Sequence, residues 1–202
     1  MKNKTKEILH ELKHHIPFTI FAVTTAIASF FLLHFFNKQE TISLFYSMHE
    51  IHLFASAMVT AAMFYRYENN FIRALLIGVT GSIIIGSLSD ILVPYLGGIA
   101  LGLKTSFHLP LIEKPVIILS ILFLGSIVGI TTKFTKFPHA IHIFVSVFAS
   151  LFYLTLFSQP ISAIFFLMVS VIVFVAVIIP CCMSDIVFPF LFLNQKIKSC
   201  GC

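Results

Sequence analysis

Long apolar runs, separated by short segments that carry charge, Pro or Gly, dominate this chain. A helix needs roughly 20 apolar residues to cross the hydrocarbon core of a bilayer. Only 10% of the 202 residues are charged, whereas a soluble domain carries about 25% charged residues. Such a chain cannot cover a water-exposed surface, so we expect it to fold in lipid, where helices satisfy their own backbone polar groups.

Pro, Gly and charged clusters divide the chain into six predicted spans. These cover about residues 16–36, 43–65, 71–96, 115–132, 138–157 and 160–193. The third is predicted to end within Pro94-Tyr95-Leu96-Gly97-Gly98. The sixth is too long for one span, so Pro180 and Pro189 predict a bend or a second short segment there. Five more spans follow the first, which we therefore interpret as an uncleaved helix and not as a signal peptide.

Positive charge is unevenly distributed between alternate connecting segments. With the N-terminus inside, ten Lys and Arg residues fall on the inner side and three, Lys38, Lys104 and Lys114, on the outer side. This bias predicts a plasma (inner) membrane protein whose two termini are cytoplasmic. The net charge of +5 therefore reflects topology, and we exclude nucleic acid as a partner. We expect lipid and a metal cation or small solute as partners, and the sequence leaves homodimer formation open.

Two blocks of sequence recur in the same order. His-Glu-Ile-His-Leu-Phe-Ala-Ser at 49–56 matches 139–146 at five of eight positions. Ser-Asp-Ile-Leu-Val-Pro at 89–94 matches 184–189 at four of six positions, and these blocks hold the only two aspartates. We therefore predict an all-α polytopic membrane protein with a single transmembrane domain, 1–202, a six-helix bundle built from two three-helix repeats, 1–100 and 101–202. Because three is odd, the second repeat is inverted in the membrane.

Each repeat combines a His-x-x-His pair with an intramembrane aspartate. Histidines at i and i+3 share one helix face, and an aspartate in the bilayer costs roughly 2.5–3.5 kcal/mol unless it finds a partner. Two imidazoles and a carboxylate are a familiar ligand set for zinc or iron. The sequence predicts two metal half-sites near opposite faces of the membrane. The outer contains His49, His52 and Asp90, and the inner contains His139, His142 and Asp185, with Cys181 and Cys182.

The two adjacent cysteines are the most distinctive part of the predicted inner half-site. Cys181 and Cys182 precede Asp185 by four and three residues, so a regular helix places them near its face. Thiolates beside imidazoles suit a soft or borderline ion such as zinc or copper(I), although a buried cysteine is also often a small apolar filler. In the tail, Cys200 and Cys202 could capture a metal, accept an acyl chain or have no role.

Small residues and prolines mark the span that carries the first aspartate. Gly78, Ser82 and Gly86 are spaced by four, which favours close packing against a neighbouring helix. Pro94 and Pro189 each follow an aspartate by four residues and predict a break in both matching spans. In transporters, backbone carbonyls freed by such breaks face the substrate.

These features favour a small secondary transporter of a divalent or soft metal cation. An intramembrane metal-dependent hydrolase is one alternative. Glu50 is its candidate base, because it is the only carboxylate adjacent to a His pair; the matching position in the second pair, 140, is Ala. A proton-coupled transporter of an organic solute is another, in which His and Asp carry only protons. The chain has no glycine-rich phosphate loop, Gly-x-Ser-x-Gly or His-Glu-x-x-His motif, so no soluble enzyme class is indicated.

Overall fold

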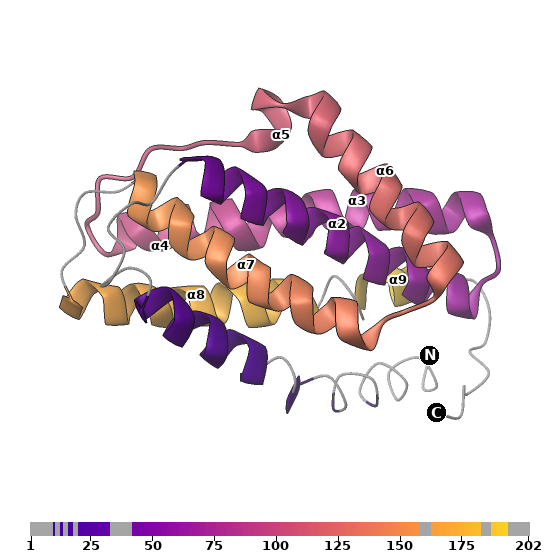
Figure 1. The fold of residues 1–202 in the computed structure, drawn as a ribbon, viewed down its shortest axis with the longest axis horizontal. Helices are drawn as coiled ribbons and strands as arrows, with labels where there is room; N and C mark the ends of the chain where they lie inside the picture. The colour runs from indigo at the N-terminus through magenta and orange to yellow at the C-terminus, as the bar shows by residue number, and fades with distance from the viewer. Residues whose placement is uncertain are drawn as a thin grey trace.

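The computed structural model describes residues 10, 13, 16–17, 20–32, 42–157, 163–182 and 187–193. Within this part of the chain every regular element is a helix, and the long helices form an elongated bundle (Figure 1). The elements are Ile20–Leu32, α2 (Ile42–Tyr67), α3 (Phe71–Ser87), η1 (Leu88–Leu92), α4 (Val93–Ala100), α5 (Pro110–Glu113), α6 (Pro115–Thr132), α7 (Lys136–Phe157), α8 (Ala163–Cys182) and α9 (Phe188–Leu191).

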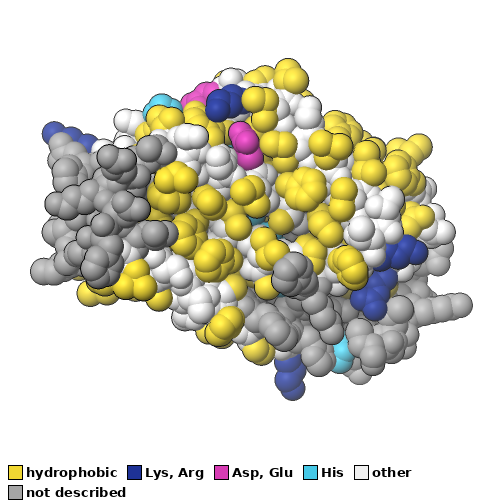
Figure 2. Space-filling view, in the orientation of Figure 1, with side chains coloured by type: hydrophobic (Ala, Val, Ile, Leu, Met, Phe, Trp, Pro, Cys, Tyr) yellow, Lys and Arg dark blue, Asp and Glu magenta, His cyan; other side chains and the backbone are white. Residues whose placement is uncertain are grey.

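Three helical stretches are long and apolar enough to cross a membrane. They are Phe71–Ala100, Pro115–Thr132 and Pro138–Phe157. Two shorter apolar helices cover Ile20–Leu32 and Leu167–Val177. α2 is also long, but its two histidines, its Glu and its Arg make it more polar. Hydrophobic side chains cover most of the described surface in Figure 2, with Lys and Arg toward its edges. These are the features of a helical membrane protein.

α2 is the central helix and packs against α3, α6 and α7. Two glycines bring α6 against its backbone. A Cβ on Gly125 would collide with the carbonyl of Phe54, and a Cβ on Gly129 would collide with that of Met58. Small residues spaced by four permit this approach between helices in membranes. The contact with α6 therefore fixes the position of α2.

The small residues of α3 also face α2. Gly78, Ser82 and Gly86 are all buried. A Cβ on Gly78 would lie 2.8 Å from the Cβ of Ala61, and one on Gly86 would collide with the side chain of Leu53. The predicted close packing of this stripe is confirmed.

The helix Ile20–Leu32 covers α7 and α8 through a shared apolar core. The ring of Phe30 lies edge-on to the rings of Phe148 and Phe152, with centroid distances of 5.7 and 4.9 Å. Edge-on aromatic pairs of this kind add to the energy of apolar burial. α7 is thus covered by Ile20–Leu32, while α2 is covered by α6.

α2 and α7 lie side by side and run in opposite directions (Figure 1). Near the start of α2, Phe45 contacts Tyr153 and Phe157, with centroid distances of 5.6 Å to both rings. Seven residues later, His52 contacts His142. Residue numbers rise along one helix as they fall along the other, which defines an antiparallel pair.

The third predicted span passes through a π-helical segment, η1, and continues to Ala100. The amide of Val93 donates to the carbonyl of Leu88, five residues back. In the same register the carbonyl of Ser89 would need the amide hydrogen of Pro94, which proline lacks. The hydroxyl of Ser150 on α7 donates to that carbonyl instead, at 3.0 Å. The helix therefore continues past Pro94 to Ala100, four residues beyond the predicted end at 96, because the wide turn and a neighbouring helix accommodate the proline.

The last predicted span contains two described helical parts, and residues 183–186 between them lie outside the described part of the chain. α8 contains Pro180 in its final turn and ends at Cys182, and the four-residue α9 follows with Pro189 at its second position. Val187, directly before α9, is π-helical. The predicted bend or second short segment falls partly on residues 183–186 and stays a prediction.

Candidate metal centre

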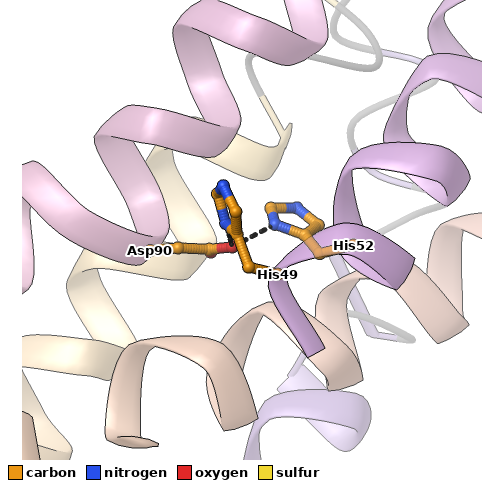
Figure 3. Close-up of side chains that lie close together, drawn as sticks. All are labelled: His49, His52 and Asp90. Atoms are coloured by element: carbon orange, nitrogen blue, oxygen red, sulfur yellow. Dashed lines mark hydrogen bonds and ion pairs between the residues drawn. The ribbon is translucent and has the colours of Figure 1, made fainter. Parts of the chain in front are cut away.

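Asp90 projects from η1 toward two histidines on α2 (Figure 3). Its Oδ2 lies 2.8 Å from His49 Nδ1 and 2.7 Å from His52 Nδ1. Each of the three residues is at most 1% exposed. The i, i+3 spacing puts both imidazoles on one face of α2, and the packing of α3 against α2 brings the aspartate to that face. The structure thus brings together the three residues of the predicted outer group.

The second carboxylate oxygen of Asp90 accepts from two serines. Oδ1 lies 2.9 Å from Ser89 Oγ and 2.7 Å from Ser146 Oγ. Ser146 belongs to α7, so the carboxylate connects η1 with both α2 and α7. Ser146 was not among the predicted site residues, although its identity with Ser56 in the repeated block was a signal for it.

His139 and His142 on α7 lie beside the histidines of α2. The rings of His52 and His142 are stacked with centroids 5.4 Å apart, and His139 lies edge-on to His142 at 5.0 Å. The predicted separation of the two pairs toward opposite faces is wrong. α2 begins ten residues before His52, a rise of roughly 15 Å, so the α2 pair lies well inside the bundle and not at its outer end.

Several predicted site residues lie outside the described part of the chain. These are Asp185 and the tail cysteines, Cys200 and Cys202. Cys181 and Cys182 end α8, but the description does not extend to their side chains. Of the predicted inner group, the structure therefore describes the side chains of His139 and His142.

The His49–His52–Asp90 group could hold a metal ion. One ligand atom from each residue lies within 4.8 Å of the others, and this is the one such group of His, Cys, Asp or Glu among the residues that the structure describes. Imidazole and carboxylate together suit zinc and related divalent ions. Buried His and Asp also form proton relays in membrane proteins. The group therefore has two chemical capabilities, metal binding and proton transfer.

A separate polar group ties the 101–114 segment to the start of α2. Glu113 accepts a hydrogen bond from Tyr46, and its Oε1 lies 3.1 Å from His108 Nδ1. Lys114 Nζ lies 3.7 Å from the centroid of the Tyr46 ring. Burial alone would raise the pKa of Glu113, but the hydrogen bonds from Tyr46 and His108 outweigh it and lower that pKa below its ordinary value.

Comparison with protein-family models, with curated proteins and with solved structures finds no match. Function is therefore inferred from the chemistry and placement of these residues. The starting points are an all-helical described chain, three helices of membrane-spanning length and a buried His–Asp group.

Proposed function

We propose that this chain is a small secondary transporter of a divalent or soft metal cation such as zinc, which binds at the group of His49, His52 and Asp90. The observation that carries this proposal is the fully buried carboxylate of Asp90, joined to both imidazoles within an apolar helical bundle. An ionisable residue in the bilayer is costly, and such residues mark ion pathways. Its position on a π-helical segment adds support, because such segments frequently occur at functional sites.

The proposed architecture is six spans in two inverted repeats, residues 1–100 and 101–202. The antiparallel pair of α2 and α7 supports it. His52 and His142 occupy equivalent positions in the two repeated blocks, and their rings are in contact. Under a twofold relation, a residue touches its own equivalent only near the axis. We therefore expect a twofold axis in the membrane plane to pass near this contact.

The packing of the outer helices supports the same architecture. Ile20–Leu32, the first helix of one repeat, covers α7 of the other, and α6 in turn covers α2. α4 and α9 begin at equivalent positions, Val93 and Phe188, each one residue before a proline. Each also follows a π-helical residue. A twofold relation between the repeats would produce this pattern, in which an outer helix of each repeat packs on the His-bearing helix of the other.

In this proposal the second repeat carries a matching half-site. Asp185 serves His139 and His142 as Asp90 serves the histidines of α2, and Cys181 and Cys182 add thiolate ligands. Ser56, the counterpart of Ser146, is buried on α2. Rocking of one repeat against the other would expose each half-site to one side in turn, as in other transporters with inverted repeats.

Basic residues support a cytoplasmic location for both termini in the plasma (inner) membrane. Arg73 and Lys133 flank one end of the bundle, where their cationic groups lie 5.5 and 5.6 Å from the ring centroids of Phe64 and Tyr65. By the positive-inside rule we assign this end to the cytoplasm. The partners in this proposal are the bilayer and the transported cation, and a homodimer is compatible with it.

A proton-coupled transporter of an organic solute is the second candidate. The hydrogen-bonding distances between Asp90 and both imidazoles favour it, because protons can pass directly along such contacts. The hydrolase alternative lacks comparable support. Glu50, its candidate base, lines a groove between α2 and α6 together with Ser47, Ile51, Phe54 and Ile121.

Metal binding to the purified protein in lipid nanodiscs tests the proposal. We expect the wild type to bind Zn²⁺ in titration calorimetry and to carry zinc into proteoliposomes. His49→Ala and His52→Ala should each weaken binding by more than roughly a hundredfold, because each removes a ligand and not merely an outer-shell partner. His108→Ala is the matched control, since His108 is only half-buried and lies in a connecting segment. A wild type that binds no zinc but transports a solute with protons would favour the second candidate.

A further inference from the structure

Glu50 on α2 is a carboxylate with no hydrogen bond or ion pair to the part of the chain that the structure describes. The other described Asp and Glu side chains each have a partner: Glu68 pairs with Arg73, Asp90 with His49 and His52, and Glu113 with Tyr46 and His108. The matching residue of the second repeated block is Ala140, so the architecture of the repeats does not require an acid here. A charge withdrawn from water is costly unless it is paired. Glu50 is therefore suited to a cationic partner from outside the chain.

The side chain of Glu50 lines a groove of about 340 Å³ between α2 and α6. The other described lining residues are Ser47, Ile51, Phe54 and Ile121. Sites for small ligands have volumes of roughly 300–1,000 Å³, so this groove is large enough for one small molecule. Ser47 and Ile51 are exposed, and the other three lining residues are half-buried. The groove thus opens at the surface of the bundle.

Contacts between α2 and the α6 region bound the groove at both ends. At one end, Lys114 Nζ, directly before α6, lies 3.7 Å from the centroid of the Tyr46 ring. At the other, a Cβ on Gly125 would collide with the carbonyl of Phe54. Tyr46 and Phe54 are each four residues from Glu50, a rise of roughly 6 Å. The carboxylate therefore lies one helical turn from each contact, in the interval where the two helices leave space.

The chemistry of the groove favours an organic cation over a metal ion. Glu50 and Ser47 offer one carboxylate and one hydroxyl, whereas zinc takes about four ligands and Ca²⁺ about six to eight. A primary ammonium donates up to three hydrogen bonds, which the two side chains can accept. The remaining lining residues are apolar and suit an alkyl chain. A phospholipid fits less well, because its phosphate would be repelled by the carboxylate.

We propose that this groove binds a single-chain primary ammonium amphiphile. The ammonium group lies on Glu50 and Ser47, and the alkyl chain lies along Phe54 and Ile121. The ring of Phe54 adds to the attraction, since aromatic faces attract cations. The described lining residues do not include His49, His52 or Asp90. The inference therefore goes beyond the proposed function and does not depend on metal binding at that group.

Binding of radiolabelled dodecylamine to the full-length protein in phosphatidylcholine nanodiscs tests this inference, with empty nanodiscs as the background. We expect saturable binding to the wild type. Glu50→Gln should weaken it roughly 10–100-fold, because a charge-assisted hydrogen bond becomes a neutral one. Ile121→Trp should weaken it about tenfold or more, since the larger side chain occupies the place of the alkyl chain. Glu68→Gln is the matched control, because Glu68 follows the other end of α2 and pairs with Arg73.

Three competitors distinguish this ligand from other occupants of the groove. Dodecanol has the same chain without the charge, Zn²⁺ has charge without a chain, and phosphatidylethanolamine carries its ammonium on a phospholipid. We expect none of them to displace the labelled dodecylamine. Displacement by any of the three would overturn the inference and assign the groove to an uncharged chain, a metal ion or a lipid headgroup. Binding that does not saturate, or equal affinity in the wild type and Glu50→Gln, would overturn it as well.

Discussion

α2 and α7 carry the same His-x-x-His pattern, and different helices pack against the outer sides of the two. On α2, one oxygen of Asp90 binds the Nδ1 atoms of both histidines. On α7, the ring of His142 stacks on His52, and His139 lies edge-on to His142. The neighbours of the helices differ as well, because α6 meets α2 at glycines, whereas Ile20–Leu32 meets α7 at Phe30. A repeated pattern thus places histidines on a helix face, but their partners decide ring orientation.

Asp90→Ala removes the acceptor that both histidines of α2 share and should have the largest effect. Two imidazoles and two hydroxyls would lose their common acceptor in a buried site. We expect the free energy of unfolding to fall by roughly 3–5 kcal/mol, as when one partner of a buried pair is removed. Denaturant titration in mixed micelles, followed by circular dichroism, measures it. Asp90→Asn, which retains an acceptor oxygen, should lose less, and a loss below about 1 kcal/mol in Asp90→Ala would contradict the observed bonding.

Gly129→Ala tests the difference in packing between the two helices. The added Cβ would collide with the carbonyl of Met58, a backbone atom that cannot turn aside. We expect a loss of about 1–3 kcal/mol of unfolding free energy, the usual effect of overpacking. Ile127→Val is the matched control on the exposed face of α6, where a substitution should change stability by less than about 0.5 kcal/mol. Equal stability of the two variants would show that α6 can move away from α2.

The smallest expected effect concerns two tyrosine hydrogen bonds, one near the start of α2 and one near the end of α7. Tyr46 on α2 donates to Glu113, and Tyr153 on α7 donates to the carbonyl of Ser106 at 2.9 Å. The folded pKa of Glu113 lies below its ordinary value of 4.5, so the unfolded chain takes up the proton first as pH falls. The stability that this contact contributes is present above about pH 4.5 and is lost as the pH falls toward the folded pKa.

We therefore expect a small decrease in Tm between pH 5.5 and 3.5 that Glu113→Gln reduces. Thermal unfolding followed by circular dichroism in detergent measures it. Glu50→Gln is the control, because it removes a carboxylate from the groove between α2 and α6 and leaves the contacts of Glu113 in place. A Tm difference between wild type and Glu113→Gln that does not change with pH would contradict the role of this carboxylate.

Helix boundaries were the most predictable part of the fold. The predicted span 115–132 coincides with α6, and 43–65 lies within two residues of α2 at each end. Both runs are bounded by proline, charge or an interfacial tyrosine, which interrupt an apolar pattern locally. The association of His49, His52 and Asp90 could be anticipated as well, since an intramembrane carboxylate requires a partner.

Features that depend on neighbouring helices could not be predicted. The sequence predicts that the third span breaks at Pro94 and ends near residue 96, but Ser150 on α7 satisfies the carbonyl that the proline leaves without a donor, and the helix continues to Ala100. Such compensation depends on where α7 lies and not on the local sequence. The depth of His52 was also misjudged, because a sequence pattern gives the order of residues but not the relative heights of two helices. The contact between Ser146 and Asp90 could not be predicted for the same reason, because it depends on the height of α7 relative to η1.

The π-helical segment also determines which helices the two parts of the third span can reach. Its wide turn contains one more residue than the α-helix would use for the same advance, and each residue of an α-helix turns the chain by roughly 100°. α3 packs on α2 and α6, whereas α4 packs on α7 and α8. Deletion of a single residue within η1 would remove the wide turn and rotate α4 away from α8. The exact number of residues in this span thus determines whether α4 can reach α7 and α8 while α3 packs on α2 and α6.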